Sequence, residues 1–110
     1  MPVIHKQVHS YHIGYISDDN SAPYPKESAY IQLRDEDKQH IGKLIFVDMS
    51  PLPNNIVHQD NEFDAFFNLD RFNDIINILR YEKPIGTDFD TDYKKLRIQA
   101  AQEPVGEEES

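Results

Sequence analysis

The chain has 110 residues, of which 38% are hydrophobic and 28% charged, and this suits a single folded domain with its own core. Twenty acidic residues against 11 basic ones give a net charge of −9, so we expect neither nucleic acid nor an anionic membrane as a partner. There is no cysteine, which excludes disulfides, thiolate catalysis and cysteine-based zinc sites.

The first segment with a clear pattern is residues 3–17, which favours a strand. Tyr11, Ile13 and Tyr15 share one face of this strand. The alternation is looser before Tyr11, which suggests a bulge or an edge position there. Residues 18–27 follow and contain two prolines among Asp, Asn and Ser, a composition typical of a loop.

An antiparallel hairpin comes next in the chain. Ala29, Ile31 and Leu33 alternate with polar or larger residues, as in a half-buried strand. Residues 35–40 are a polar reversal, and the segment after it ends in a continuous apolar run, which indicates a strand covered on both faces. The proline-containing residues 50–61 then favour an extended connection. The next stretch, NEFDAFF, fits either a short strand or an approach to a helix.

The clearest prediction is a helix over residues 69–81. Its apolar residues fall in one sector roughly 120° wide on a helical wheel, and they are Leu69, Phe72, Ile75, Ile76 and Leu79. Asn68 is the expected N-cap, and Lys83 before Pro84 closes the helix. Ile78 lies off the apolar sector, so we expect it to contact a flanking loop or a second subunit.

The last part of the ordered chain predicts another hairpin, with a reversal near residues 90–92. In its second strand Leu96, Ile98 and Ala100 face one side. Residues 103–110 form an acidic tail, for which we expect disorder beyond Pro104. The sequence therefore predicts one α+β domain over residues 1–102. Its fold would be a bent, mainly antiparallel sheet or open β-barrel in the order β-β-β-α-β-β, with one amphipathic helix.

Three aspartates at alternate positions are the most suggestive candidate for a metal site. Asp88, Asp90 and Asp92 match the first, third and fifth positions of a calcium loop, but Tyr93 and Gln99 stand where that loop needs Gly and Glu. An Asp-x-Asp phosphotransfer motif would need a buried parallel strand and distant partners. We therefore interpret the triplet as a charged hairpin turn and expect no metal or cofactor.

The histidines and serines give no catalytic or metal site either. His5, His9 and His12 have helical spacing, but on a strand His5 and His9 lie about 13 Å apart and His12 points away. No serine lies in a Gly-x-Ser-x-Gly turn, and the four glycines are too scattered for a phosphate-binding loop. We expect surface histidines, no catalytic residues and a protein that is not an enzyme.

The aromatic residues are mainly expected in the core. Phe63, Phe66 and Phe67 are more than one short segment usually buries in a small domain, so a homodimer contact is the second interpretation. The longest apolar run, residues 44–47, is too short to span a bilayer, and the first ten residues lack the apolar core of a secretory signal. We expect a cytoplasmic location.

Two short stretches carry a resemblance to a known family. LRYEKPI at residues 79–85 and EPVGEEES at residues 103–110 together resemble a family of short, uncharacterised bacterial proteins. In that family a helix ending in Leu-Arg-x-Glu-Lys-Pro precedes a hairpin and a terminal Glu-Pro-Val-Gly-Glu segment. The resemblance covers about the last third of the chain. It implies an autonomous small bacterial domain, with no reaction, cofactor or catalytic residue to carry over.

The charge distribution carries the functional hypothesis. Residues 60–92 hold nine acidic and three basic residues, a local net charge of −6. We expect a non-enzymatic protein-interaction or regulatory module, with Asp70, Asp74 and Asn77 on the exposed helix side as the docking face for a basic protein. The alternatives are an immunity or inhibitor protein that caps a basic toxin such as a nuclease, and a small-ligand binder in a barrel mouth.

Overall fold

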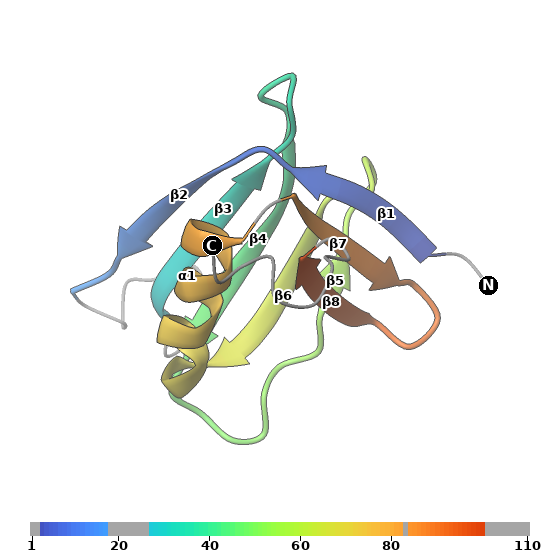
Figure 1. Ribbon diagram of the computed structural model, residues 1–110. Helices are drawn as coiled ribbons and strands as arrows, with labels where there is room; N and C mark the ends of the chain where they lie inside the picture. The colour runs from blue at the N-terminus through green and yellow to red at the C-terminus, as the bar shows by residue number, and fades with distance from the viewer. Residues whose placement is uncertain (1–2, 18–26, 83, 101–110) are drawn as a thin grey trace.

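The computed structural model of this chain describes residues 3–17, 27–82 and 84–100. They form eight strands in two sheets, a one-turn 3-10 helix and one α-helix (Figure 1). The predicted α+β class with a bent, mainly antiparallel arrangement and one amphipathic helix is confirmed, and the two sheets do not close into a barrel. The predicted order β-β-β-α-β-β is incomplete, because six strands precede the helix and two follow it. The predicted tail, residues 103–110, and residues 18–26 of the predicted loop lie outside the described residues.

The larger sheet has five strands in the order β2-β3-β4-β6-β5. Their bounds are β2 Ser10–Tyr15, β3 Glu27–Arg34, β4 His40–Val47, β5 Ile56–Val57 and β6 Phe63–Asn68. Strands β2, β3 and β4 pair antiparallel, which confirms the predicted β3–β4 hairpin. Strands β4 and β6 pair parallel, with the short β5 antiparallel to β6 at the edge. The stretch NEFDAFF is thus a strand from Phe63 onward.

The smaller sheet has three antiparallel strands in the order β1-β7-β8. They are β1 Val3–Val8, β7 Ile85–Asp90 and β8 Lys95–Ala100, so the predicted closing hairpin is confirmed. The single strand predicted for residues 3–17 is divided at His9, with one half in each sheet. The backbone N–H of His9 donates to the carbonyl of Arg34 at 2.8 Å, which holds the chain where it leaves one sheet for the other.

The predicted helix over residues 69–81 contains two different helices. A 3-10 turn, η2 (Leu69–Arg71), leads into α1 (Phe72–Tyr81), which buries Ile75, Ile76 and Leu79. Leu69 is 39% exposed, so its predicted place in the apolar sector is wrong. A 3-10 turn has 3.0 residues per turn instead of 3.6, and this rotates Leu69 away from the face that α1 buries. Asn68 precedes η2 as predicted, but its side chain makes no capping hydrogen bond.

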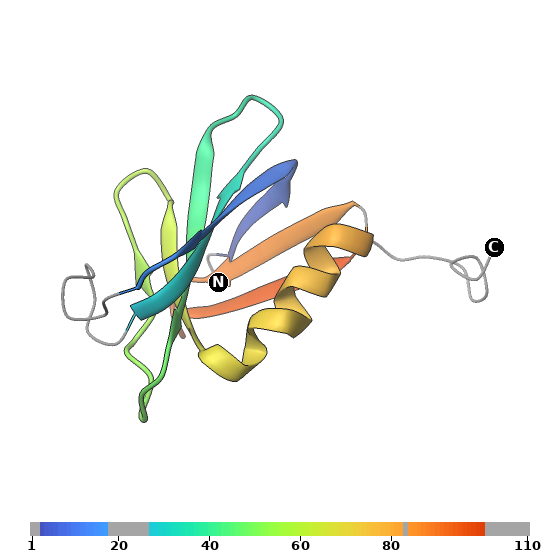
Figure 2. The same cartoon turned by 90° about the vertical axis from the view of Figure 1, so that its left-hand side faces the viewer.

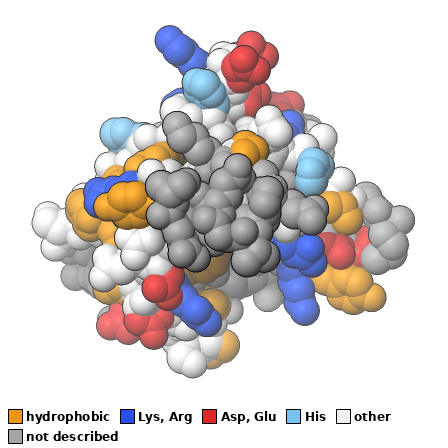
Figure 3. All heavy atoms as spheres, viewed as in Figure 1, with side chains coloured by type: hydrophobic (Ala, Val, Ile, Leu, Met, Phe, Trp, Pro, Cys, Tyr) orange, Lys and Arg blue, Asp and Glu red, His pale blue; other side chains and the backbone are white. Residues whose placement is uncertain are grey.

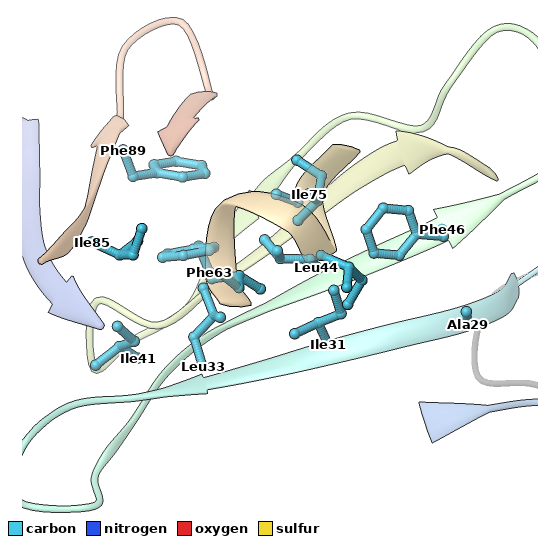
Figure 4. Close-up of a cluster of buried hydrophobic side chains, with 13 residues drawn as sticks. Ala29, Ile31, Leu33, Ile41, Leu44, Phe46, Phe63, Ile75, Ile85 and Phe89 are labelled. Carbon is cyan, nitrogen blue, oxygen red and sulfur yellow. The ribbon is translucent and has the colours of Figure 1, made fainter. Parts of the chain in front are cut away.

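Helix α1 and the smaller sheet cover the same face of the five-stranded sheet (Figure 2). The core between them contains Phe63 from β6 and Phe89 from β7, whose rings stack with centroids 5.5 Å apart (Figure 4). Ile75 of α1 lies over Leu44 and Phe46 in the same view. Ile78 is half-buried against this core, so it contacts its own chain.

A second apolar cluster lies on the opposite face of the larger sheet. Ile45, Val47 and Phe66 are almost fully buried there, with Met49 packed against them. Phe63 and Phe67 belong to the first cluster, so all three phenylalanines of β6 find contacts within one chain. The aromatic surplus that suggested a dimer is accounted for without a second copy. Among the described residues, none of the helices has the length and apolar character needed to cross a membrane.

Candidate functional site

The outer face of the three-stranded sheet carries the most organised polar constellation. Successive strand residues point to opposite faces, and Ile4, Val8 and Phe89 point inward to the core. The other face carries three rows that run across β1, β7 and β8. These rows are Val3–Asp90–Lys95, His5–Asp88–Arg97 and Gln7–Gly86–Gln99.

His5, Asp88 and Gln99 of this face are joined by hydrogen bonds across three strands. The ring Nδ1 of His5 contacts Asp88 Oδ1, and Gln99 Nε2 donates to Asp88 Oδ2 at 2.8 Å. The Asp88 side chain is only 17% exposed, whereas that of His5 is 70% exposed. Asp88 is therefore fixed from both sides, and it orients the imidazole of His5 so that Nε2 remains for another partner.

A hollow adjoins this constellation. It has a volume of about 410 Å³ and is lined by His5, Gln7, Gly86 and Gln99, with Pro84, Ile85 and Ala100 completing the wall. A second hollow of about 470 Å³ lies at the other end of the face, between Val3, Asp90 and Lys95. His5 and Asp88 therefore stand between two depressions, and only the first contains a glycine in its lining.

Acidic residues gather at the end of the larger sheet where β4 and β6 begin. Because these two strands are parallel, the turns that precede them, residues 35–39 and 58–62, lie at the same end. This acidic end carries the carboxylates of Asp35, Glu36, Asp37, Asp60, Glu62 and Asp64. Only Arg34 and Lys38 supply cations within residues 34–40 and 58–64. Acidic side chains (red) mark this end at the top of Figure 3, with basic side chains (blue) and a histidine (pale blue) beside them.

Several of these carboxylates already have partners. Asp35 accepts hydrogen bonds from the backbone N–H groups of Asp37 and Gln39, both at 2.9 Å, and so shapes its own turn. His58 Nε2 lies 3.0 Å from Asp64 Oδ2, and His40 Nε2 lies 3.7 Å from Glu62 Oε1. Glu36, Asp37 and Asp60 are exposed, and no hydrogen bond or ion pair engages their side chains among the described residues. These three carboxylates are the ones available to a partner.

The predicted docking face on the helix lies elsewhere. Asp70, Asp74 and Asn77 are exposed, as expected. However, β6 ends where η2 begins, so this face lies at the opposite end of β6 from the acidic end (Figure 1). Arg71 and Arg80 on the same two helices offset the charge of the aspartates. The acidic residues of the 60–92 region are therefore dispersed over several faces.

The aspartate triplet performs two separate tasks. Asp88 is bound by His5 and Gln99, whereas Asp90 Oδ1 accepts the backbone N–H groups of Asp92 and Tyr93 at 2.9 and 3.1 Å. Asp90 therefore stabilises the turn, as predicted for this segment. In the part of the chain that the structure describes, no group of three or more His, Cys, Asp or Glu residues is placed to hold a metal ion.

The three N-terminal histidines are not brought together. His5 lies in β1 of the smaller sheet, His12 lies in β2 of the larger one, and His9 stands at the bend between them. The pairing of His5 with Asp88, which are 83 residues apart, was not predicted from the sequence. The only local signal was that both residues occupy polar positions in strands where polar and apolar residues alternate.

Glu27 and Lys43 form a buried charge pair that the sequence did not predict. Glu27 is fully buried, and neither carboxyl oxygen has a hydrogen-bond partner among the described residues. Lys43 Nζ lies 3.7 Å from Glu27 Oε2 and 4.7 Å from the centre of the Tyr30 ring. The ammonium group thus supplies the counter-charge that a buried carboxylate requires.

Comparison with known proteins adds no assignment, since no family model, curated protein or solved structure matches the chain. The resemblance of residues 79–85 and 103–110 to a bacterial family therefore stays a prediction.

Proposed function

We propose that this chain is a protein-interaction module that binds a basic protein through its acidic end. The observation that carries the proposal is that two separate turns at one end of the larger sheet carry the exposed carboxylates of Glu36, Asp37 and Asp60. The contact between His40 and Glu62 at 3.7 Å links the β4 and β6 sides of this end. The predicted helix face, with Asp70 and Asp74, becomes the alternative docking surface.

The physics of association favours a basic partner. A surface of one sign attracts a partner of the opposite sign and raises the rate of encounter. Such steering weakens as salt reduces the screening length to about 8 Å at physiological ionic strength. Exposed carboxylates without fixed partners lose little when they form new ion pairs. The acidic end meets this requirement better than the helix, where arginines stand among the aspartates.

The test compares two variants that remove the same amount of charge. Asp37→Asn/Asp60→Asn neutralises two carboxylates of the acidic end, and Asp70→Asn/Asp74→Asn neutralises two on the helix face. Partners are captured from an extract of the native host at low and at physiological salt, and the affinity of each captured protein is then measured with purified components. We expect the first variant to lose about tenfold or more in affinity for a basic partner, and the second to bind like the native chain.

Two results would contradict this proposal. Equal affinity of all three proteins would mean that the acidic end only keeps the chain soluble. Loss of binding in the helix variant alone would move the docking face to Asp70 and Asp74.

A narrower form of the proposal is an immunity or inhibitor protein for a basic toxin such as a nuclease. In that case the captured partner has nuclease activity, and an equimolar amount of this chain abolishes it. The ligand-binding alternative would need a site other than a barrel mouth, because the two sheets do not close into a barrel and the stacked rings of Phe63 and Phe89 lie between them. The cytoplasm remains the proposed location, which fractionation of the host tests directly.

We also retain the homodimer as a proposal, now on different grounds. Strand β8 has no further strand beside it among the described residues, and an open edge can pair with a second copy. An antiparallel β8–β8 pair centred on Ile98 places Leu96 opposite Ala100 and Arg97 opposite Gln99, which puts no like charges face to face. Light scattering over a range of concentrations shows whether the mass doubles. A mass of one chain, 12.9 kDa, at high concentration refutes the dimer.

A further inference from the structure

The glycines within strands provide the first step of a separate inference. A Cβ built on Gly14 would lie 2.2 Å from the ring of Tyr30, and one on Gly42 would lie 2.3 Å from the ring of Phe63. Glycine is therefore required at Gly42, where the Phe63 ring is fully buried, whereas at Gly14 the end of the half-buried Tyr30 side chain would have to move. At Gly86 the nearest atom to such a Cβ is the carbonyl oxygen of Lys6 at 3.8 Å, which is ordinary contact.

Gly86 thus has no packing reason to be glycine. Its φ also lies outside the left-handed range that favours this residue. Glycine in a strand interior is unfavourable by about 0.5–1 kcal/mol relative to alanine. What the missing side chain does provide is space, because Gly86 lies in the lining of the hollow of about 410 Å³ beside His5.

The imidazole at the rim of this hollow is held in one orientation. Asp88 binds its Nδ1, and Gln99 in turn holds Asp88. A carboxylate on Nδ1 favours the tautomer that carries its proton there, which leaves a lone pair on Nε2. His12 offers a contrast, since it is also exposed on a strand but contacts no carboxylate among the described residues.

We propose that His5, positioned by Asp88 and Gln99, acts as the general base in the hydrolysis of a small uncharged ester. The ester would bind in the hollow of about 410 Å³ beside Gly86. The hollow suits such a ligand, because its lining combines the neutral amides of Gln7 and Gln99 with the apolar Pro84 and Ala100. This activity goes beyond the proposed binding function and departs from the expectation that the chain is not an enzyme.

The reaction consumes only water and the ester. His5 Nε2 takes a proton from a water molecule while the water oxygen bonds to the carbonyl carbon. The resulting tetrahedral species then breaks its bond to the alkoxy or aryloxy group, and the imidazolium returns the proton to that leaving oxygen. The products are an acid and an alcohol or phenol, and the imidazole is regenerated. His5 is the catalytic residue, whereas Asp88 and Gln99 are positioning residues.

The probe for the test is p-nitrophenyl acetate, whose product is measured by absorbance. We expect His5→Gln to lower kcat/KM at least about tenfold, because it removes the base, and His12→Gln to leave it unchanged. Gly86→Ala should raise KM about tenfold with kcat unchanged, since its methyl group occupies the hollow without a clash against its neighbours. Unfolding curves of each variant show that the fold is intact.

A spectroscopic measurement tests the positioning role of Asp88. The ¹⁵N chemical shifts of the His5 ring should show the Nδ1-protonated tautomer in the native chain. In Asp88→Asn they should shift toward the Nε2-protonated one, with a fall in kcat of about tenfold. The proposal is overturned if the native chain hydrolyses the ester no faster than His5→Gln. It is equally overturned if Gly86→Ala has native kinetics, or if the His5 tautomer is the same with and without Asp88.

Discussion

Gly42 illustrates how a single residue can set the packing of the whole core. The ring of Phe63 lies over it, with three ring carbons 2.3–2.6 Å from where a Cβ would be. Phe63 is fully buried and stacked on Phe89, so its ring has no free space into which it can move.

Gly42→Ala should therefore destabilise the fold by about 1–3 kcal/mol, the usual effect of overpacking. Gly86→Ala is the matched control, and it should leave stability unchanged or raise it slightly. Urea unfolding of both variants measures the difference. Equal midpoints for the two would show that Phe63 moves aside without loss.

The Glu27–Lys43 pair gives a second prediction at this scale. Lys43→Met removes the charged partner at 3.7 Å and leaves a fully buried carboxylate without a counter-charge. We expect a loss of about 3 kcal/mol in the free energy of unfolding, because breaking a buried pair leaves one charge uncompensated.

The control for this prediction is the double variant Glu27→Gln/Lys43→Met. It removes both charges and should recover part of the stability, since a neutral amide is less costly to bury than a charge. A single variant as stable as the native chain would mean that the ion pair contributes nothing.

Helix α1 with η2 shows what the periodicity of a single element does and does not predict. The apolar sector located the helix and identified Ile75, Ile76 and Leu79 as buried. It misplaced Leu69, because the wheel assumed 3.6 residues per turn over a segment that starts as a 3-10 turn. The sequence of residues 69–71 carries no signal for a 3-10 turn.

Alanine substitutions separate the two leucines experimentally. Leu79→Ala should cost about 2–5 kcal/mol, because Leu79 is 8% exposed and packs in the main core. Leu69→Ala makes the same chemical change at a site that is 39% exposed, and we expect less than about 1 kcal/mol. Denaturant unfolding measures the free energy of unfolding of each variant. Similar losses for Leu79→Ala and Leu69→Ala would show that Leu69 is buried.

The β7–β8 turn yields another element-scale prediction. Asp90 accepts two backbone N–H groups in this turn, so Asp90→Ala should lower the free energy of unfolding by about 1 kcal/mol. Asp92→Ala removes an exposed carboxylate from the same turn and should have little effect. Thermal unfolding of the two variants distinguishes them. A loss of stability in Asp92→Ala but not in Asp90→Ala would contradict the role of Asp90 in stabilising the turn.

At the scale of the whole molecule, Asn55 joins parts of the chain that are distant in sequence. Its Oδ1 accepts the backbone N–H of Phe66 at 2.8 Å, and its Nδ2 donates to the carbonyl of Lys94 at 2.9 Å. The first bond belongs to the five-stranded sheet and the second to the turn of the smaller sheet. One side chain therefore ties the two sheets at the end away from their bend at His9.

Asn55→Ala should lower the free energy of unfolding by about 1–3 kcal/mol, because it breaks both bonds at once. Hydrogen exchange should show reduced protection in β6 and in β7–β8 together, since the two sheets lose a shared contact. Asn54→Ala is the control at the exposed neighbouring position. Reduced protection in only one sheet would contradict the role of Asn55 as a tie between them.

The arrangement of the two sheets is the part of the fold that the sequence did not predict. Local alternation revealed the hairpins β3–β4 and β7–β8, because their partners are neighbours in the chain. The looser alternation before Tyr11 suggested a bulge or an edge position, but it could not show that β1 and β2 belong to different sheets. The constellation of His5, Asp88 and Gln99 depends on that division, and for this reason no sequence pattern indicated it.

The pairing of β1 with β7 has a consequence for how the protein is made. Val3 lies opposite Asp90 and Val8 opposite Ile85, so β1 is synthesised well before the strand with which it pairs. During synthesis at about 5–20 residues per second, β1 waits several seconds before β7 emerges. Until then the smaller sheet cannot form, and the apolar side chains of Ile4 and Val8 have no sheet in which to pack. The nascent chain is thus exposed to aggregation until β7 has emerged, and closure of the long loop between β1 and β7 slows folding.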